Sequence, residues 1–176
     1  MRFVDFLRTT VLLSAGAATA LATVTVLASG ASADKSVTLI AAGWWVLAAA
    51  IGLWLGRRAQ TSSPIASLLA GAKSSTTLPE HHPSAILVNR LWPLLLFTFL
   101  SGGLAFLAPQ IPGIAAGFAI IWALAWRRQD AAVAAIEERD GASFYVRRTS
   151  PVRPMALVRT PGFKSARAER VNGAVT

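Results

Sequence analysis

Two short clusters in this 176-residue chain contain residue types that could do chemistry, and the first is Glu80-His81-His82. A carboxylate and two imidazoles serve as metal ligands in many proteins. Metal sites, however, space their ligands so that the side chains converge, for example one helical turn apart. Adjacent histidines between Pro79 and Pro83 lack that spacing. The sequence therefore predicts a linker here, without a bound metal.

The second cluster is acidic and consists of Glu137, Glu138 and Asp140. Paired carboxylates can act as general acid and base, but no histidine, nucleophile or metal-ligand spacing accompanies these three. Three basic residues would face them across a predicted β-hairpin, where cross-strand ion pairs account for the same residues. They are Arg139, Arg147 and Arg148. We therefore expect ion pairs here, and no enzymatic activity.

Missing residue types exclude further chemistry. The chain has no cysteine, which excludes thiol redox chemistry, disulfide exchange, thiolate metal sites and palmitoylation. Both histidines lie outside the apolar segments, so a haem held between membrane helices would lack axial ligands. We predict no cofactor.

The elements that must position all other groups are four apolar segments without Asp, Glu, Lys, Arg or His. They are residues 9–29, 37–56, 91–108 and 111–126. About 20 helical residues cross a hydrocarbon core of about 30 Å, so the last two segments are short by about two and four residues. Flanking arginines can lengthen both by snorkelling. The predicted fold class is an all-α integral membrane protein with four transmembrane helices in two antiparallel hairpins.

The basic residues predict the orientation of these helices. Sixteen of the seventeen Lys and Arg residues fall in three stretches, residues 1–8, 57–90 and 127–176. Only Lys35 would lie on the other side. Because positive charges stay in the cytoplasm, we predict that both termini and the middle loop are cytoplasmic. The protein would then be a multi-pass protein of the inner (plasma) membrane, with transmembrane hairpins at 9–56 and 91–126.

An alternative interpretation of the first segment is a cleaved signal peptide. Residues 1–8 resemble a signal n-region, and Ala31-Ser32-Ala33 has the form of a cleavage site. About 17 to 20 residues separate Arg8 from that site, which is longer than the 7 to 15 of a typical signal h-region. The length favours a retained helix; cleavage would leave three spans.

The charge-free spans also limit the transport mechanisms that the chain can use. Proton-coupled transporters place Asp, Glu or His at membrane depth, and this chain offers only hydroxyls there. They belong to Ser14, Thr19, Thr23, Thr25, Thr38, Thr98 and Ser101. We expect each hydroxyl to bond to a carbonyl one turn earlier or to another helix.

Small residues four positions apart predict where helices approach closely. The candidate pairs are Gly16 with Ala20, Gly52 with Gly56, and Gly113 with Gly117. Packing within one bundle is the favoured interpretation, and a dimer interface is the alternative.

Two elements are predicted in the cytoplasmic segments. Ser63-Pro64 is typical of a helix start, and apolar residues with helical spacing follow as far as Ala72, which predicts a short surface helix before a linker at 74–83. Asp140-Gly141 predicts a hairpin turn between strands at 133–139 and 142–148. A helical stalk over 131–138 is the alternative. We expect disorder after about residue 165.

The net charge of +9 lies beside the predicted membrane ends, which favours anionic lipid headgroups over nucleic acid as partner. The candidate contact residues are Arg127, Arg128, Arg147, Arg148, Arg153 and Arg159. Ala- and Arg-rich, Lys-poor usage is typical of a bacterium with a GC-rich genome. We predict a non-catalytic structural, interaction or accessory component that contacts lipid or an unknown membrane protein, or that forms a homo-oligomer. A small oligomeric permease or channel with an uncharged pathway is the alternative.

Overall fold

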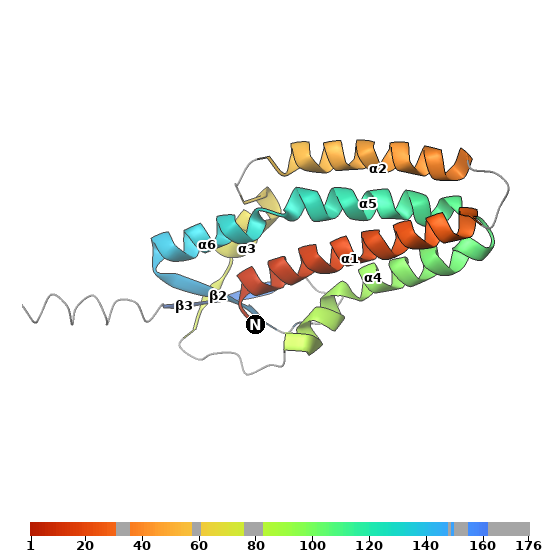
Figure 1. Ribbon diagram of the computed structural model, residues 1–176. Helices are drawn as coiled ribbons and strands as arrows, with labels where there is room; N and C mark the ends of the chain where they lie inside the picture. The colour runs from red at the N-terminus through yellow and green to blue at the C-terminus, as the bar shows by residue number, and fades with distance from the viewer. Residues whose placement is uncertain (31–35, 58–60, 76–82, 148, 150–154, 162–176) are drawn as a thin grey trace, which may run out of the picture. The chain divides into compact units, whose positions relative to one another are not determined.

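The computed structural model describes residues 1–30, 36–57, 61–75, 83–147, 149 and 155–161 (Figure 1). These residues are mostly helical and form two compact units. The helical unit comprises Leu7–Ala59 and Arg90–Arg128, and the sheet unit comprises Met1–Phe6, Gln60–Asn89 and Gln129–Thr176. Several predicted features lie outside the described residues. They are Ala31-Ser32-Ala33, Glu80-His81-His82, Arg148, Arg153 and the residues after 165.

Long apolar helices dominate the chain. They are α1 (Phe3–Gly30), α2 (Ser36–Leu55), α4 (Pro83–Gly103) and α5 (Gln110–Trp126), with a 3₁₀ turn η1 (Leu104–Phe106) after α4. Among the described residues, three helices are long and apolar enough to cross a membrane, judged by length and composition. They are Phe3–Gly30, Ser36–Leu55 and Ser84–Phe106. The prediction of long apolar helices is therefore confirmed for three helices by length and composition. Because α5 has only 17 residues, the fourth transmembrane helix stays a prediction.

Within the helical unit, α5 lies between α2 and α1 (Figure 1). The pair α2 and α5 makes the most extensive helix–helix contact among the described residues, although these helices are not neighbours in sequence. The buried residues of α5 are mostly Ala and Gly, and Leu21 of α1 packs against Ala115 and Ala116. Small side chains let helix backbones approach, which is a main source of association in lipid.

Six of the seven hydroxyl groups named in the sequence analysis make the predicted kinds of hydrogen bond. Ser14, Thr19, Thr23, Thr25 and Thr98 each donate a hydrogen bond to the carbonyl four residues earlier, at 2.7–3.0 Å. One contact joins two helices, because the hydroxyl oxygens of Ser29 and Thr38 lie 2.6 Å apart. These hydroxyls are therefore satisfied inside the protein and act in packing.

Among the described residues, the sheet unit contains two complete helices and three strands, together with the first residues of α1 and α4. The complete elements are α3 (Ser63–Ala70), α6 (Gln129–Asp140), β1 (Lys73–Ser74), β2 (Ala142–Arg147) and β3 (Ala156–Pro161). The strand order is β1-β3-β2, with β1 parallel and β2 antiparallel to β3. Ala142, Phe144 and Val146 are buried on β2, while the residues between them are half-buried. This alternation places one face of β2 in the core of the unit.

The predicted hairpin at Asp140-Gly141 is wrong, and the alternative of a helix over 131–138 is correct. This helix is separate from α5, because Arg127 and Arg128 form a turn between them. Residues 133–139 belong to helix α6, and the antiparallel partner of β2 is β3. Four alanines within α6 favour helix. Gly141 has φ +58° and directly follows the helix, where glycine commonly adopts the left-handed conformation that ends it.

The short helix in the middle segment is confirmed, with shifted ends. Its N-cap is Ser62 instead of Ser63, and it ends at Ala70 instead of Ala72. Lys73 and Ser74 pair with β3, so the sheet includes the first residue of the predicted linker. The predicted tail over 1–8 is also largely structured, because α1 begins at Phe3.

Candidate functional site

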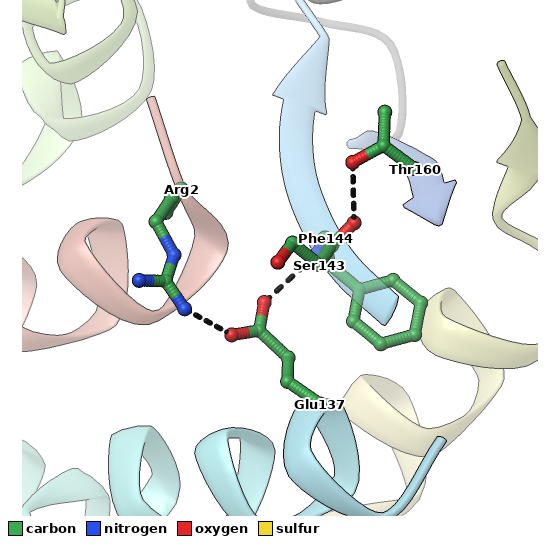
Figure 2. A network of polar contacts seen from close by, with 5 residues as sticks. All are labelled: Arg2, Glu137, Ser143, Phe144 and Thr160. Carbon is green, nitrogen blue, oxygen red and sulfur yellow. Dashed lines mark hydrogen bonds and ion pairs between the residues drawn. The ribbon is translucent and has the colours of Figure 1, made fainter. Parts of the chain in front are cut away.

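The carboxylate of Glu137 joins two distant parts of the sheet unit (Figure 2). Its Oε2 accepts a hydrogen bond from the Arg2 guanidinium at 2.6 Å, and its Oε1 accepts one from the Phe144 backbone N–H at 2.8 Å. The side chain of Glu137 is only 5% exposed, whereas that of Arg2 is 50% exposed. The bond to Glu137 and its negative charge raise the pKa of Arg2. Both contacts are charge-assisted and therefore stronger than neutral hydrogen bonds.

The first two residues of the chain complete the outer edge of β2. The Val146 N–H donates to the Met1 carbonyl at 3.1 Å, and Arg2 forms an antiparallel bridge with Tyr145. With Glu137 bound to the Phe144 N–H, this edge is covered on both sides of Tyr145. Covered edges do not pair with strands of other chains.

The acidic cluster is divided between two environments. Glu137 is buried, whereas Glu138 and Asp140 are exposed. Asp140 forms an ion pair with the adjacent Arg139 at 2.8 Å, which lowers the pKa of Asp140, and the Arg159 charge lowers it further. The expected ion pair with Arg139 is therefore present, but it joins neighbouring residues and does not cross between strands, because residues 133–139 are helical. The partner of Glu137 is Arg2, which was not predicted.

The Glu137 network joins structural elements of the sheet unit. The described residues contain no group of three His, Cys, Asp or Glu side chains that could hold a metal ion. Each carboxylate oxygen of Glu137 already accepts a hydrogen bond from the protein. What the network does is fasten the N-terminus and α6 to the outer edge of β2.

Two of the predicted lipid-contact residues lie at one end of the helical unit. Arg127 and Arg128 directly follow α5, and Arg57 follows α2. The Arg128 guanidinium donates to the Arg57 carbonyl at 2.8 Å. The Arg127 Nε is buried and has no hydrogen-bond partner among the described residues. We call Arg57, Arg127 and Arg128 the arginine cluster.

The remaining contact candidates belong to the sheet unit. Arg147 is exposed at the end of β2, and Arg159 is exposed on β3, close enough to Asp140 to influence its pKa. The described contacts therefore do not bring the predicted arginines into one cluster.

Glycines on α2 allow the C-terminal ends of α2 and α5 to approach. A Cβ atom added to Gly52 would lie 2.8 Å from the Leu124 Cβ, and one added to Gly56 would collide with the Leu124 carbonyl oxygen. By contrast, nothing lies within 4 Å of such an atom at Gly16, and Ala20 lines a cavity between α1 and α4.

Glycines on α5 accommodate neighbouring side chains. Gly113 lies against Thr25 and Ala41, and Gly117 lies under the indole ring of Trp44. The predicted glycine pairs of α2 and α5 thus both lie at contacts within one chain.

Sequence reasoning missed the role of Trp44 and Trp45. Their indole N–H groups donate to the carbonyls of Ile114 at 3.1 Å and Gly113 at 2.8 Å. Two tryptophans inside an apolar segment were the available signal, because a buried indole N–H needs an acceptor. Together with Gly117, they fasten α2 to α5.

The described residues define a mostly helical protein with three helices able to cross a membrane and a small three-stranded sheet. Comparisons with known protein families, with curated proteins and with solved structures gave no match.

Proposed function

We propose that the chain is a four-span protein of the inner (plasma) membrane and a non-catalytic interaction component. Its N-terminus, middle segment and C-terminal segment face the cytoplasm. There they form the sheet unit, which the basic helix ends hold at an anionic lipid surface, where the unit is available to a protein partner.

The observation that carries this proposal is that the sheet unit is built from three separate segments of the chain. It combines three segments that are far apart in sequence. Arg2 of the first segment bonds to Glu137 of the third, and β1 of the second pairs with β3 of the third. A folded unit lies on one side of a bilayer, so the chain must cross an even number of times between successive segments. Two apolar helices stand in each interval, α1 with α2 and α4 with α5.

The same argument supports a membrane crossing by α5. Its 17 residues extend about 26 Å at 1.5 Å per residue, slightly less than the hydrocarbon core. Arg127 and Arg128 follow it directly, and their long side chains can reach the headgroups from within the membrane edge. If α5 did not cross, β1 and β3 would lie on opposite sides of the bilayer.

The structure also supports retention of the first helix. Cleavage after Ala33 would remove Met1 and Arg2, which cover the outer edge of β2. It would also leave the buried Glu137 carboxylate without its cationic partner. An uncompensated buried charge is strongly destabilising.

The distribution of charge supports lipid contact mainly at the helix ends. The helical unit holds seven Lys and Arg against one acidic residue, Asp34, whereas the sheet unit holds ten against seven. Each cation near an anionic membrane surface contributes about 1 kcal/mol of attraction before screening. The larger excess of positive charge thus belongs to the helical unit, whose helix ends are expected at the level of the headgroups.

The alternative, a small oligomeric permease or channel, is supported by one cavity. It lies between α1 and α4, has a volume of about 850 Å³, and among its described lining residues Thr98 alone has a polar side chain. Such a pathway suits only an apolar solute. Uptake of a small apolar solute into liposomes that contain the purified chain tests it. We expect no uptake driven by a pH gradient in either case, because no residue of the predicted spans can carry the proton.

Cysteine labelling tests the proposed topology, and the absence of native cysteine makes each introduced thiol unique. Gln110→Cys should react with an impermeant maleimide in intact cells. Ser67→Cys and Arg147→Cys should react only after the membrane is opened. All three positions are exposed. Labelling of Arg147→Cys in intact cells would overturn the four-span scheme.

A further inference from the structure

The C-terminal ends of α2 and α5 are held together by backbone contacts. Gly56 packs directly against the Leu124 carbonyl, and Arg128 donates to the Arg57 carbonyl. Any side chain at position 56 would separate the two helices. The glycine therefore brings Arg57 and Arg128, which follow the two helix ends, close together.

No carboxylate of the helical unit neutralises this cluster. The acidic residue of the unit is Asp34, which precedes α2, whereas the cluster follows α2 and α5. The C-terminal helix dipoles offset part of the positive charge, at about half an elementary charge for each helix. Asp130, two residues after Arg128, adds one negative charge from the sheet unit, where its Oδ1 accepts from the Ala131 N–H. The three arginines still leave a net positive charge, and it attracts an anion.

The Arg127 Nε atom indicates where the anion binds. This N–H donor is buried and has no acceptor among the described residues. Leaving a buried donor unsatisfied costs as much as losing a hydrogen bond, so such groups commonly point to a ligand or ion. A guanidinium presents two parallel donors that match the oxygens of a phosphate.

The aromatic residues of the same helix ends indicate a lipid source for this phosphate. Trp122 and Trp126 are stacked with ring centroids 5.3 Å apart, and Trp54 is 67% exposed near the end of α2. Tryptophan concentrates at the level of lipid headgroups. The cluster therefore lies where lipid phosphates are, given the topology of the proposed function.

We propose that Arg57, Arg127 and Arg128 form a binding site for the phosphate of one anionic phospholipid headgroup. The site deepens the proposed function and rests on it, because the headgroup belongs to the cytoplasmic leaflet. Arg127 supplies the unpaired donor, and Gly56 sets the distance between the helices.

Native mass spectrometry of the full chain in mild detergent tests the site with phosphatidylglycerol as probe. When phosphatidylglycerol is added in small amounts, we expect each chain to retain one lipid molecule. Phosphatidylcholine should not be retained to a comparable degree. Arg127→Gln should weaken retention about tenfold, as for loss of a charge-assisted pair. Arg127→Lys should recover only part of it, because lysine lacks the fork of donors.

Arg8→Gln is the matched control, since Arg8 is an exposed arginine near the start of α1 and outside the cluster. It removes the same charge, so its lipid retention should fall much less than that of Arg127→Gln. Gly56→Ala should lower retention without changing charge. An excess of inorganic phosphate distinguishes the two sources of phosphate: we expect the lipid to stay bound, and complete displacement would overturn a headgroup site. Near-native thermal unfolding of each variant shows that the fold is intact.

The site and the proposed topology can fail separately. Undiminished phosphatidylglycerol binding by both Arg127→Gln and Gly56→Ala would overturn the site, while cysteine labelling would still support four spans. Labelling that contradicts the topology would instead overturn the proposed function and, with it, the assignment of the headgroup to the cytoplasmic leaflet.

Discussion

The guanidinium of Arg2 lies 2.6 Å from the buried carboxylate of Glu137, across 135 residues of sequence. Arg2 directly precedes α1, the first helix that is able to cross a membrane. Glu137 belongs to α6 and also bonds to β2. The ion pair therefore connects the start of the first long helix to the sheet formed near the end of the chain.

Glu137→Ala should destabilise the sheet unit by about 1–3 kcal/mol, because the buried Phe144 N–H loses its acceptor. Arg2 is half exposed, so the lost ion pair contributes little beyond this. Glu137→Gln should cost less, since its amide oxygen can still accept. Hydrogen exchange at Phe144 measures the effect. Glu138→Ala, an exposed neighbour, is the control, and an equal effect there would contradict the assignment.

The Arg139–Asp140 pair should be visible in a pH titration. Its bond to Arg139 lowers the pKa of Asp140 in the folded protein. A lowered pKa contributes stability above the unfolded value of about 3.9, and that contribution is lost as pH falls through the folded pKa. Arg139→Gln should raise the pKa of Asp140 toward its ordinary value, as followed by NMR of the carboxyl carbon. An unchanged midpoint would show that the pair does not form in solution.

Alanine substitutions should distinguish packed glycines from open ones. Gly117→Ala would force a Cβ into the Trp44 ring, and overpacking of this kind costs about 1–3 kcal/mol. Gly16→Ala meets nothing within 4 Å and should be neutral or slightly stabilising, because alanine favours helix. Thermal unfolding in detergent compares the two variants. Equal stability would mean that Trp44 does not pack on α5.

Local patterns in the sequence determined the long helices and two of the smaller elements. Runs of apolar residues predicted α2 and α5 to within one residue of their observed bounds, because hydropathy is a property of neighbouring residues. The same runs located α1 and α4 but missed their starts, since α1 begins six residues and α4 eight residues before the predicted segments. Pro64 marked the first turn of α3, because the fixed φ of proline suits that position. Phe144, Tyr145 and Val146 predicted β2, in which all residues but the exposed Arg147 are partly or fully buried.

Tertiary structure alone decided which elements pair. Asp140-Gly141 suits both a hairpin turn and a helix end, and the pairing of β2 with β3 selected the helix end. The partner of Glu137 is 135 residues away in the sequence. The most extensive contact of α2 is with α5, which is not its neighbour in sequence. Such choices depend on which distant surfaces fit, and a pattern of neighbouring residues carries no information about that fit.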